Sequence, residues 1–240
     1  MSAEKETIMS PRNALHLYEA LMLLALKDKE GTVAADSTGF SFALGGSLLA
    51  ELFLLGKAEL QQVKKKKFVE LLDPSPVGDP ILDECLEKLG TSKRRAQINN
   101  WVSRFTHLKK LRQRAAQQLC HRGILRADEE SVLLIFKRKI YPELDPGPER
   151  QLVETLRKAI FSDDSDLDAL TSVLVALADK AGVLKNVFEK RELKARKKRL
   201  EEIAEGEVTA AAVKELVQAT QAAVMTAVTA STVAAAAGAS

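Results

Sequence analysis

The feature that most constrains the fold is a stretch near the N-terminus, residues 15–26, that is almost entirely apolar (LHLYEALMLLAL). Its apolar side chains fall nearly all round a helical wheel and not along a single stripe: Leu17, Ala20, Leu21, Met22, Leu23, Leu24 and Leu26. A helix of this kind must be covered on most of its faces by other elements. The stretch is too short to span a bilayer and contains Glu19, so the sequence predicts a helical domain built around it.

A second apolar stretch, residues 42–55, repeats this pattern and stops at Gly56. Gly45 and Gly46 near its start permit close contact with another helix, because they carry no side chain. A phosphate-binding loop would need more glycines and a lysine at fixed spacing, so this pair does not indicate one. The second stretch is therefore expected to pack closely as another core helix.

Further helices are indicated by periodicity and by capping residues. Asp79 and Pro80 can begin a helix over residues 81–89, and Gly90 can end it. Trp101 is expected to anchor a helix over residues 98–105 in the core. The remaining helices are predicted over residues 149–160, 166–181 and 183–204, and from 209 onward. The sequence thus predicts a mainly α fold.

Length and composition predict one globular domain. The chain has 240 residues, of which 46% are hydrophobic, enough for a sizeable core. We expect a flexible segment over residues 1–13, a helical domain over 14–230 and an Ala-rich tail over 231–240. The end of the chain is uncharged, but it is rich in Ala, Thr and Val, with little to drive membrane insertion. Two cysteines and no apolar leader indicate a reducing, cytoplasmic compartment.

A basic helix is predicted over residues 106–123 (THLKKLRQRAAQQLCHRG), ending at Gly123. Its apolar face would be formed by Leu108, Leu111, Ala115 and Leu119. Cations border this face: Lys109 and Arg112 lie three residues apart on one side, and Lys110 and Arg114 lie on the other. This arrangement places positive charge along the edge of a packed helix.

A hairpin is predicted next, over residues 124–141, with a polar turn at 127–130. Its second arm contains five consecutive apolar residues: Val132, Leu133, Leu134, Ile135 and Phe136. Such a run fits a strand that is buried on both faces. It equally fits an apolar tip that enters an anionic membrane, and three following cations, at 137–139, favour this second interpretation. A winged helix that addresses DNA through the basic helix and hairpin is a third alternative.

Composition and motifs exclude several function classes. The formal net charge is only +3, from 36 basic and 33 acidic side chains, so an anion site must come from local clustering. One Trp and two Tyr make base stacking on single-stranded nucleic acid improbable. His16, His107 and His121 are isolated, and the sequence contains no nucleophile elbow and no zinc motif. We therefore expect no enzyme activity, no catalytic residues, no metal and no cofactor.

Several segments, in the same order and spacing, resemble the Golgi phosphoprotein family. They are residues 15–31 (LHLYEALMLLALKDKEG), 44–52 (LGGSLLAEL), 56–57 (GK), 79–84 (DPILDE), 111–115 (LRQRA) and 123–125 (GIL). The resemblance implies a mostly helical fold around a four-helix core with one protruding hairpin. It also implies a peripheral membrane protein that binds phosphatidylinositol 4-phosphate and inserts the hairpin tip into the bilayer. In eukaryotes the family acts at the Golgi and retains glycosyltransferases through their cytosolic tails and the coatomer coat.

The resemblance transfers the family's phosphate site only in part. Two basic residues three apart correspond to Lys109 and Arg112, and we add Arg114 as a third head-group candidate. A further family Arg corresponds to Gly45, and a family Trp has no counterpart, although Phe40 or Phe42 could take its place. The N-terminal arginine cluster that meets the coat is also missing, which suits a bacterial relative.

The resulting prediction is an adaptor on the cytoplasmic face of a membrane. It would bind phosphatidylinositol 4-phosphate or another anionic lipid, and the cytosolic tails of membrane proteins are possible partners. No nucleic acid is expected. The alternative is a winged-helix-like module that binds nucleic acid or protein.

Overall fold

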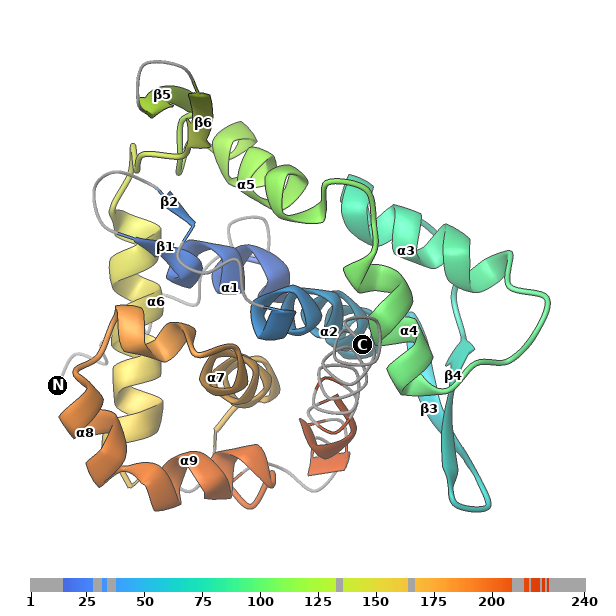
Figure 1. Ribbon diagram of the computed structural model, residues 1–240. Coiled ribbons are helices and arrows are strands. Elements are labelled where there is room, and N and C mark those ends of the chain that lie inside the picture. Colours follow the sequence, from blue (N-terminus) through green and yellow to red (C-terminus); the bar gives the residue numbers. More distant parts are fainter. Residues whose placement is uncertain are drawn as a thin grey trace, which may run out of the picture.

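The computed structural model is mainly helical, as predicted (Figure 1). It describes residues 15–27, 32–33, 38–132, 136–163 and 167–208, together with 214, 215, 217–220, 222 and 224. Within these residues no helix combines the length and the apolar character needed to cross a membrane.

The central helices are α1 (Leu17–Ala25) and α2 (Thr38–Leu54), which pack against each other. Every residue of α1 is buried, including Glu19, as its apolar circumference requires. Helix α7 (Ala169–Ala181) covers the pair on one side, and α4 (Ile98–Thr106) and α5 (Leu111–His121) cover it on the other (Figure 1). The first apolar stretch is therefore the centre of the domain, as the sequence predicted.

The remaining helices surround this core: α3 (Pro80–Gly90), α6 (Gly147–Phe161), the 3-10 helix η1 (Val183–Asn186), α8 (Lys190–Ala195) and α9 (Lys197–Ala204). The predicted cap of α3 is confirmed, because the Asp79 carboxylate accepts hydrogen bonds from the Ile81 and Leu82 amides, each at 2.9 Å. Trp101 is 2% exposed, which confirms it as a core residue of α4.

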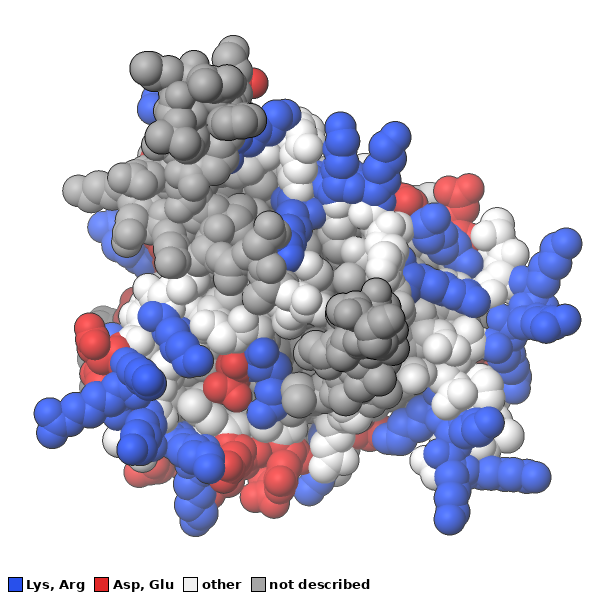
Figure 2. Space-filling model, in the orientation of Figure 1, with Lys and Arg blue, Asp and Glu red and all other residues white. Residues whose placement is uncertain are grey.

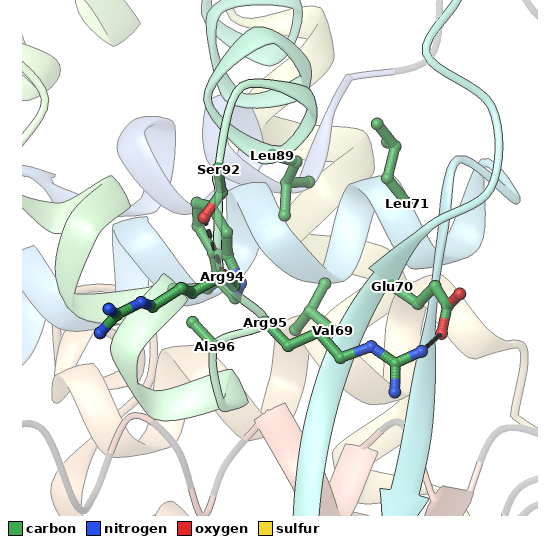
Figure 3. Close-up of a pocket in the computed structure, with 9 residues that line it drawn as sticks. Val69, Glu70, Leu71, Leu89, Ser92, Arg94, Arg95 and Ala96 are labelled. Atoms are coloured by element: carbon green, nitrogen blue, oxygen red, sulfur yellow. Dashed lines mark hydrogen bonds and ion pairs between the residues drawn. The ribbon is translucent and has the colours of Figure 1, made fainter.

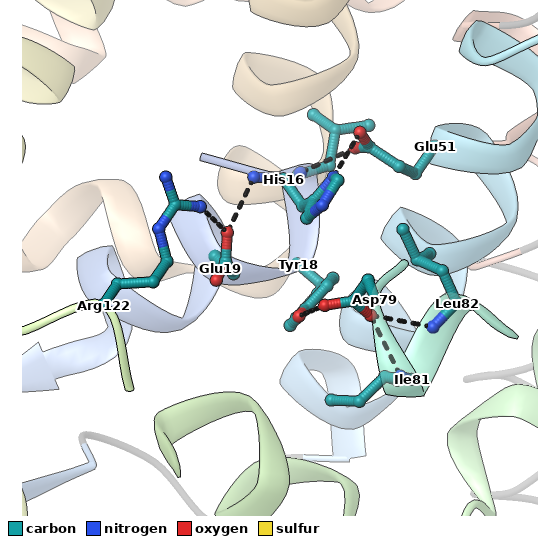
Figure 4. A network of polar contacts seen from close by, with 9 residues as sticks. His16, Tyr18, Glu19, Glu51, Asp79, Ile81, Leu82 and Arg122 are labelled. Carbon is teal, nitrogen blue, oxygen red and sulfur yellow. Dashed lines mark hydrogen bonds and ion pairs between the residues drawn. The ribbon is translucent and has the colours of Figure 1, made fainter. Parts of the chain in front are cut away.

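A buried polar network ties α1 to its neighbours (Figure 4). The Tyr18 hydroxyl donates to Asp79 at 2.6 Å, and the Glu19 carboxylate accepts from Arg122. His16 donates through Nδ1 to Glu51 at 2.9 Å. Burial lowers the pKa of His16, but the hydrogen bond and charge of Glu51, with help from other carboxylates, outweigh it and raise the pKa. These contacts satisfy the polar groups that the apolar core would otherwise leave unpaired.

Three two-stranded antiparallel sheets occur in the described part of the chain, where one hairpin was predicted. They pair β1 (Leu26–Lys27) with β2 (Thr32–Val33), β3 (Ala58–Val63) with β4 (Lys66–Leu71), and β5 (Asp128–Val132) with β6 (Phe136–Ile140). The β3–β4 hairpin was not predicted, because its turn contains Lys64 at φ 56°, where a glycine would have been the usual signal.

Two predicted helices differ from the structure. The basic helix begins at Leu111 and not at residue 106, because α4 runs to Thr106 and Lys110 adopts a left-handed conformation at φ 54°. The helix predicted over 183–204 is broken into η1, α8 and α9. The break between η1 and α8 contains Phe188, which is buried at 4% exposure, and the next residue, Glu189, caps the start of α8.

The predicted hairpin over 124–141 is confirmed, but its turn was placed wrongly. Residues 128–130 belong to strand β5, and Val132 pairs with Phe136. In the register of the two strands Glu129 lies opposite Lys139, and Glu130 lies opposite Arg138. Ile124 and Leu125, which were assigned to the first arm, are buried at its base.

Candidate functional site

Of the predicted head-group residues, Lys109 lies in the turn between α4 and α5, residues 107–110, which we call the basic turn. Lys109 and Lys110 are exposed, whereas Leu108 is 5% exposed and anchors the turn in the core. Lys110 precedes α5 as its N-cap and makes no side-chain capping bond. Lys109 therefore projects from a turn and not from the helix on which the sequence had placed it.

Gly45 on α2 allows the basic turn to lie close to the core. A Cβ atom built at Gly45 would stand 2.3 Å from the Thr106 hydroxyl oxygen and 2.7 Å from the Val102 carbonyl oxygen. Both distances are far below van der Waals contact, so α2 and α4 touch through this glycine. An arginine could not replace Gly45 while α4 stays in its present position, because α4 leaves no room for a side chain there.

Arg112 lies in the first turn of α5 and points toward the start of α2. Its guanidinium donates to the Ser41 hydroxyl and lies over the Phe40 ring, 5.4 Å from the ring centroid. Phe40 is fully buried, and Phe42 is 4% exposed and meets the edge of His107. Both phenylalanines adjoin the basic site, but neither offers an exposed ring in place of the family Trp.

Arg114 points in a different direction from the other predicted residues. Its guanidinium pairs with the Glu84 carboxylate and donates to the Pro80 carbonyl oxygen at 3.3 Å, both on α3. The pair is about three-quarters buried and holds α5 against α3. Arg112 therefore contacts α2 and Arg114 contacts α3, whereas Lys109 is exposed in the basic turn.

Lys110 is a further candidate that the site prediction left out. Neither Lys109 nor Lys110 forms an ion pair with any residue that the structure describes. Both stand at the N-terminal end of α5, where the helix dipole carries partial positive charge. The sequence placed Lys110 on the opposite border of the helix, because nothing in a Lys-Lys pair signals a left-handed residue.

The hairpin extends from the other end of α5. Gly123 adopts φ 72° after the helix, as predicted, and Leu125 then bridges to Glu143 at the base of the stem. Of the predicted membrane residues, Val132 and Phe136 are a strand pair at the far end of the stem. Leu133, Leu134 and Ile135 lie outside the described residues, so the structure does not choose between a buried arm and a membrane tip.

The basic turn and the hairpin lie along one edge of the molecule. Helix α5 has 11 residues and is therefore about 16 Å long, with the basic turn at one end and the hairpin beyond the other (Figure 1). Figure 2 shows Lys and Arg side chains along the edge that α5 forms, and also over α8 and beside β3 and β4. A flat anionic surface could contact both features at once.

Glu143 at the base of the hairpin is a titratable group that the sequence did not indicate. Burial, together with the nearby carboxylates of Glu149 and Asp145, raises the pKa of Glu143 to about 7. Its Oε1 atom is buried and has no hydrogen-bond partner among the described residues. Among all the residues that the structure describes, no group of three His, Cys, Asp or Glu side chains is placed to hold a metal ion.

Comparison with known proteins agrees with the resemblance noted from the sequence. The model of the Golgi phosphoprotein 3 (GPP34) family matches residues 17–220. The vacuolar protein sorting-associated protein 74 of Schizosaccharomyces pombe is 30% identical over 178 residues, which cover 67% of this chain. The match covers 50% of that relative, so the chain corresponds to about half of its length. The chain belongs to the Golgi phosphoprotein 3 family.

Proposed function

We propose that this protein binds the cytoplasmic face of a membrane as a peripheral adaptor that recognises anionic phospholipid. The observation that carries the proposal is that two exposed lysines, Lys109 and Lys110, precede α5 and form no ion pair with any described residue, while Arg112 follows in the first turn of the helix. A phosphate group placed there would meet two ammonium groups, the N-terminal end of a helix dipole and a guanidinium already held in position by Ser41.

Phosphatidylinositol 4-phosphate is the proposed head group, because Lys109 and Arg112 occupy the positions of the family's phosphate ligands. Gly45 supplies no third ligand, since α4 fills the space beside it. Lys110, which is exposed at the start of α5, can supply a further positive charge to the phosphate. We therefore expect weaker discrimination between phosphatidylinositol 4-phosphate and other anionic lipids than a site with three fixed cations would give.

The hairpin is proposed to add an apolar contribution to membrane binding. Each fully buried Leu or Phe contributes about 1.5–3 kcal/mol. The two strands of the stem carry three acidic residues at 128–130 and three basic residues at 137–139, so the stem has little net charge. The electrostatic contribution then falls mainly on the basic turn.

The adaptor role is proposed from the family and from the relative. The name of the S. pombe protein assigns it to vacuolar protein sorting, and the family name places its members at the Golgi. We propose that this chain likewise connects a membrane to the cytosolic tails of membrane proteins. The tails would be recruited while the basic turn and the hairpin hold the adaptor to the lipid.

Vesicle pelleting with charge-matched variants tests the lipid site. Phosphatidylcholine vesicles would carry phosphatidylserine, phosphatidylinositol 4-phosphate or neither. Changing Lys109 and Lys110 to Ala should weaken binding to both anionic vesicles by about 2 kcal/mol, at about 1 kcal/mol per cation near the surface. The matched control changes Lys64 and Lys65, which are equally exposed at the β3–β4 turn. Equal losses in the two double variants would show adsorption by net charge and refute the site.

No observation favours the winged-helix alternative. A recognition helix must present free basic side chains to a groove, whereas Arg112 and Arg114 on α5 are both held by neighbouring helices. A duplex-DNA shift beside the pelleting assay separates the two functions. Tight, salt-sensitive DNA binding without vesicle binding would overturn the membrane proposal.

A further inference from the structure

We propose that a small cavity beside Trp101 is a binding site for a carboxylate attached to a short apolar group. The cavity lies between strand β4, the loop that joins α3 to α4, and α4 itself (Figure 3). Its volume is about 200 Å³. This Trp101 pocket is distinct from the basic turn, and its ligand is independent of the membrane proposal.

The first observation is an unpaired donor in the wall of the pocket. Trp101 lines the cavity and is 2% exposed, and its indole Nε1 is buried without a hydrogen-bond partner among the described residues. A buried N–H group without a partner is unfavourable, and native proteins almost always satisfy such groups. A ligand in the pocket that carries a hydrogen-bond acceptor would therefore be favoured, because it could pair with the Trp101 indole N–H.

The second observation is the excess of positive charge around this donor. Arg94 and Arg95 line the pocket, and the Arg104 guanidinium lies over the indole face, 4.5 Å from the ring centroid. Glu70 is the one carboxylate in the lining, and it pairs with Arg95 at 2.9 Å. The acceptor that this environment favours is consequently an anion.

Arg95 is free to exchange its partner at low cost. The Arg95 and Glu70 side chains are 56% and 38% exposed, and an exposed ion pair contributes little to stability. In Figure 3 Arg95 extends past Val69 to Glu70, whereas Arg94 leaves the loop in the opposite direction. An anion in the pocket could take the place of Glu70 on Arg95 while it accepts the indole hydrogen bond.

The apolar walls specify the rest of the ligand. Val69 and Leu71 from β4, Leu89 from α3 and Ala96 from the loop form these walls. At about 200 Å³ the cavity is smaller than the roughly 300–1,000 Å³ of sites for drug-sized ligands, so a small ligand is favoured. Ser92 adds no free donor, because its hydroxyl donates to the Arg94 carbonyl oxygen at 2.9 Å. A short aliphatic carboxylate fits these conditions better than inorganic phosphate does.

Such a carboxylate has two possible sources. It can be a free short-chain acid, or it can be the C-terminal carboxylate of a peptide that ends in a small aliphatic residue. Both present the same group to Trp101 and Arg95, so the experiment must include one probe of each kind.

The chain provides its own reporter, because Trp101 is the only tryptophan. A ¹⁵N-labelled sample gives one indole cross-peak, and its proton should shift downfield when the N–H donates to a ligand. We expect a saturable shift with sodium butyrate and with N-acetyl-Ala-Val bearing a free C-terminus. Butyramide, the amidated peptide and sodium chloride at equal ionic strength should leave the peak in place.

Arg95→Ala should weaken butyrate binding roughly tenfold, because a charge-assisted hydrogen bond is lost. The control Arg191→Ala removes an exposed arginine from α8 and should bind as the parent does. A shift that butyramide reproduces would show that the pocket does not recognise the negative charge, and a shift that never saturates would show that there is no binding site; either result would overturn the proposal. A saturable shift with sodium phosphate but not with butyrate would also overturn it. Tighter binding of the free-acid peptide than of butyrate would identify a chain terminus as the source.

Discussion

Replacing Gly45 with Ala tests whether the contact between α2 and α4 positions the basic turn. The new Cβ atom would lie 2.3 Å from the Thr106 hydroxyl oxygen, 2.7 Å from the Val102 carbonyl oxygen and 2.8 Å from the Thr106 amide nitrogen. Two of these three atoms belong to the backbone of α4, so rotation of a side chain cannot relieve the overlap. The helices must move apart by about 1 Å, a gap that forfeits a quarter to a half of each affected contact.

The expected magnitude follows from two opposing effects. Overpacking of a core costs about 1–3 kcal/mol, and a backbone collision belongs at the upper end of that range. Alanine in a helix interior is favoured over glycine by about 0.5–1 kcal/mol. The Gly45→Ala protein should therefore lose about 2 kcal/mol of unfolding free energy, which for a chain of this size lowers the melting temperature by about 4–8 °C.

Gly46 provides the matched control on the same helix. A Cβ atom there meets Val224 Cγ2 at 2.6 Å, and the next two nearest atoms, Leu177 Cδ2 at 3.6 Å and Thr220 Cγ2 at 3.7 Å, also belong to side chains. Because a valine side chain can rotate or shift, Gly46→Ala should change the unfolding free energy by less than about 1 kcal/mol. Urea unfolding of both variants measures the difference. A Gly45→Ala protein as stable as the parent would refute the close packing inferred beside the basic turn.

Three further predictions concern pH, the hairpin and the cap of α3. The pKa of Glu143 is raised to about 7 from a usual value of 4.5, so the native state binds an extra proton between these pH values and the unfolding free energy should fall as pH rises through this window. Glu143→Gln should reduce the difference in unfolding free energy between pH 5 and pH 8, measured by urea unfolding. The same difference in the parent and the variant would contradict this prediction. If the hairpin tip enters the membrane, Leu134→Asp should leave the melting temperature unchanged and reduce vesicle binding. The control Leu72→Asp, at a leucine that is 53% exposed elsewhere on the surface, should change neither the melting temperature nor vesicle binding. A Leu134→Asp protein that unfolds would indicate the buried strand instead. Asp79→Ala should lower the unfolding free energy by about 2–3 kcal/mol, because α3 loses its cap and the Tyr18 hydroxyl loses its acceptor. Asp79→Asn should retain most of the cap and therefore more of the stability. Equal melting temperatures for the two variants would contradict this explanation.

Much of the helical fold could be predicted because local signals agreed with the burial pattern. Helix α3 begins at the Asp79–Pro80 cap and ends at Gly90, and α4 begins at Ile98, as expected. The errors occurred where the chain turns without Gly or Pro. Lys64 and Lys110 both have positive φ, which is uncommon for lysine, so the β3–β4 hairpin and the start of α5 gave no sequence signal.

The site could be predicted only in part, because its partners come from distant segments. The resemblance led to Lys109 and Arg112, but the contact of Arg114 with Glu84 joins residues 30 positions apart. Likewise, the collision that keeps Gly45 free of a side chain involves Val102 and Thr106 on another helix. Periodicity describes which residues share a face, and it does not reveal which neighbour occupies the opposite face.

The strand register changes how the electrostatic contribution to membrane binding is divided. From the sequence, the three cations at 137–139 seemed to favour membrane contact at the hairpin. The structure places these cations on a strand that pairs with the acidic residues at 128–130, so the net charge of the stem is close to zero. Lys109 and Lys110 form no ion pair with any described residue. The salt dependence of vesicle binding should therefore follow the basic turn, and the dependence on apolar substitution should follow the hairpin.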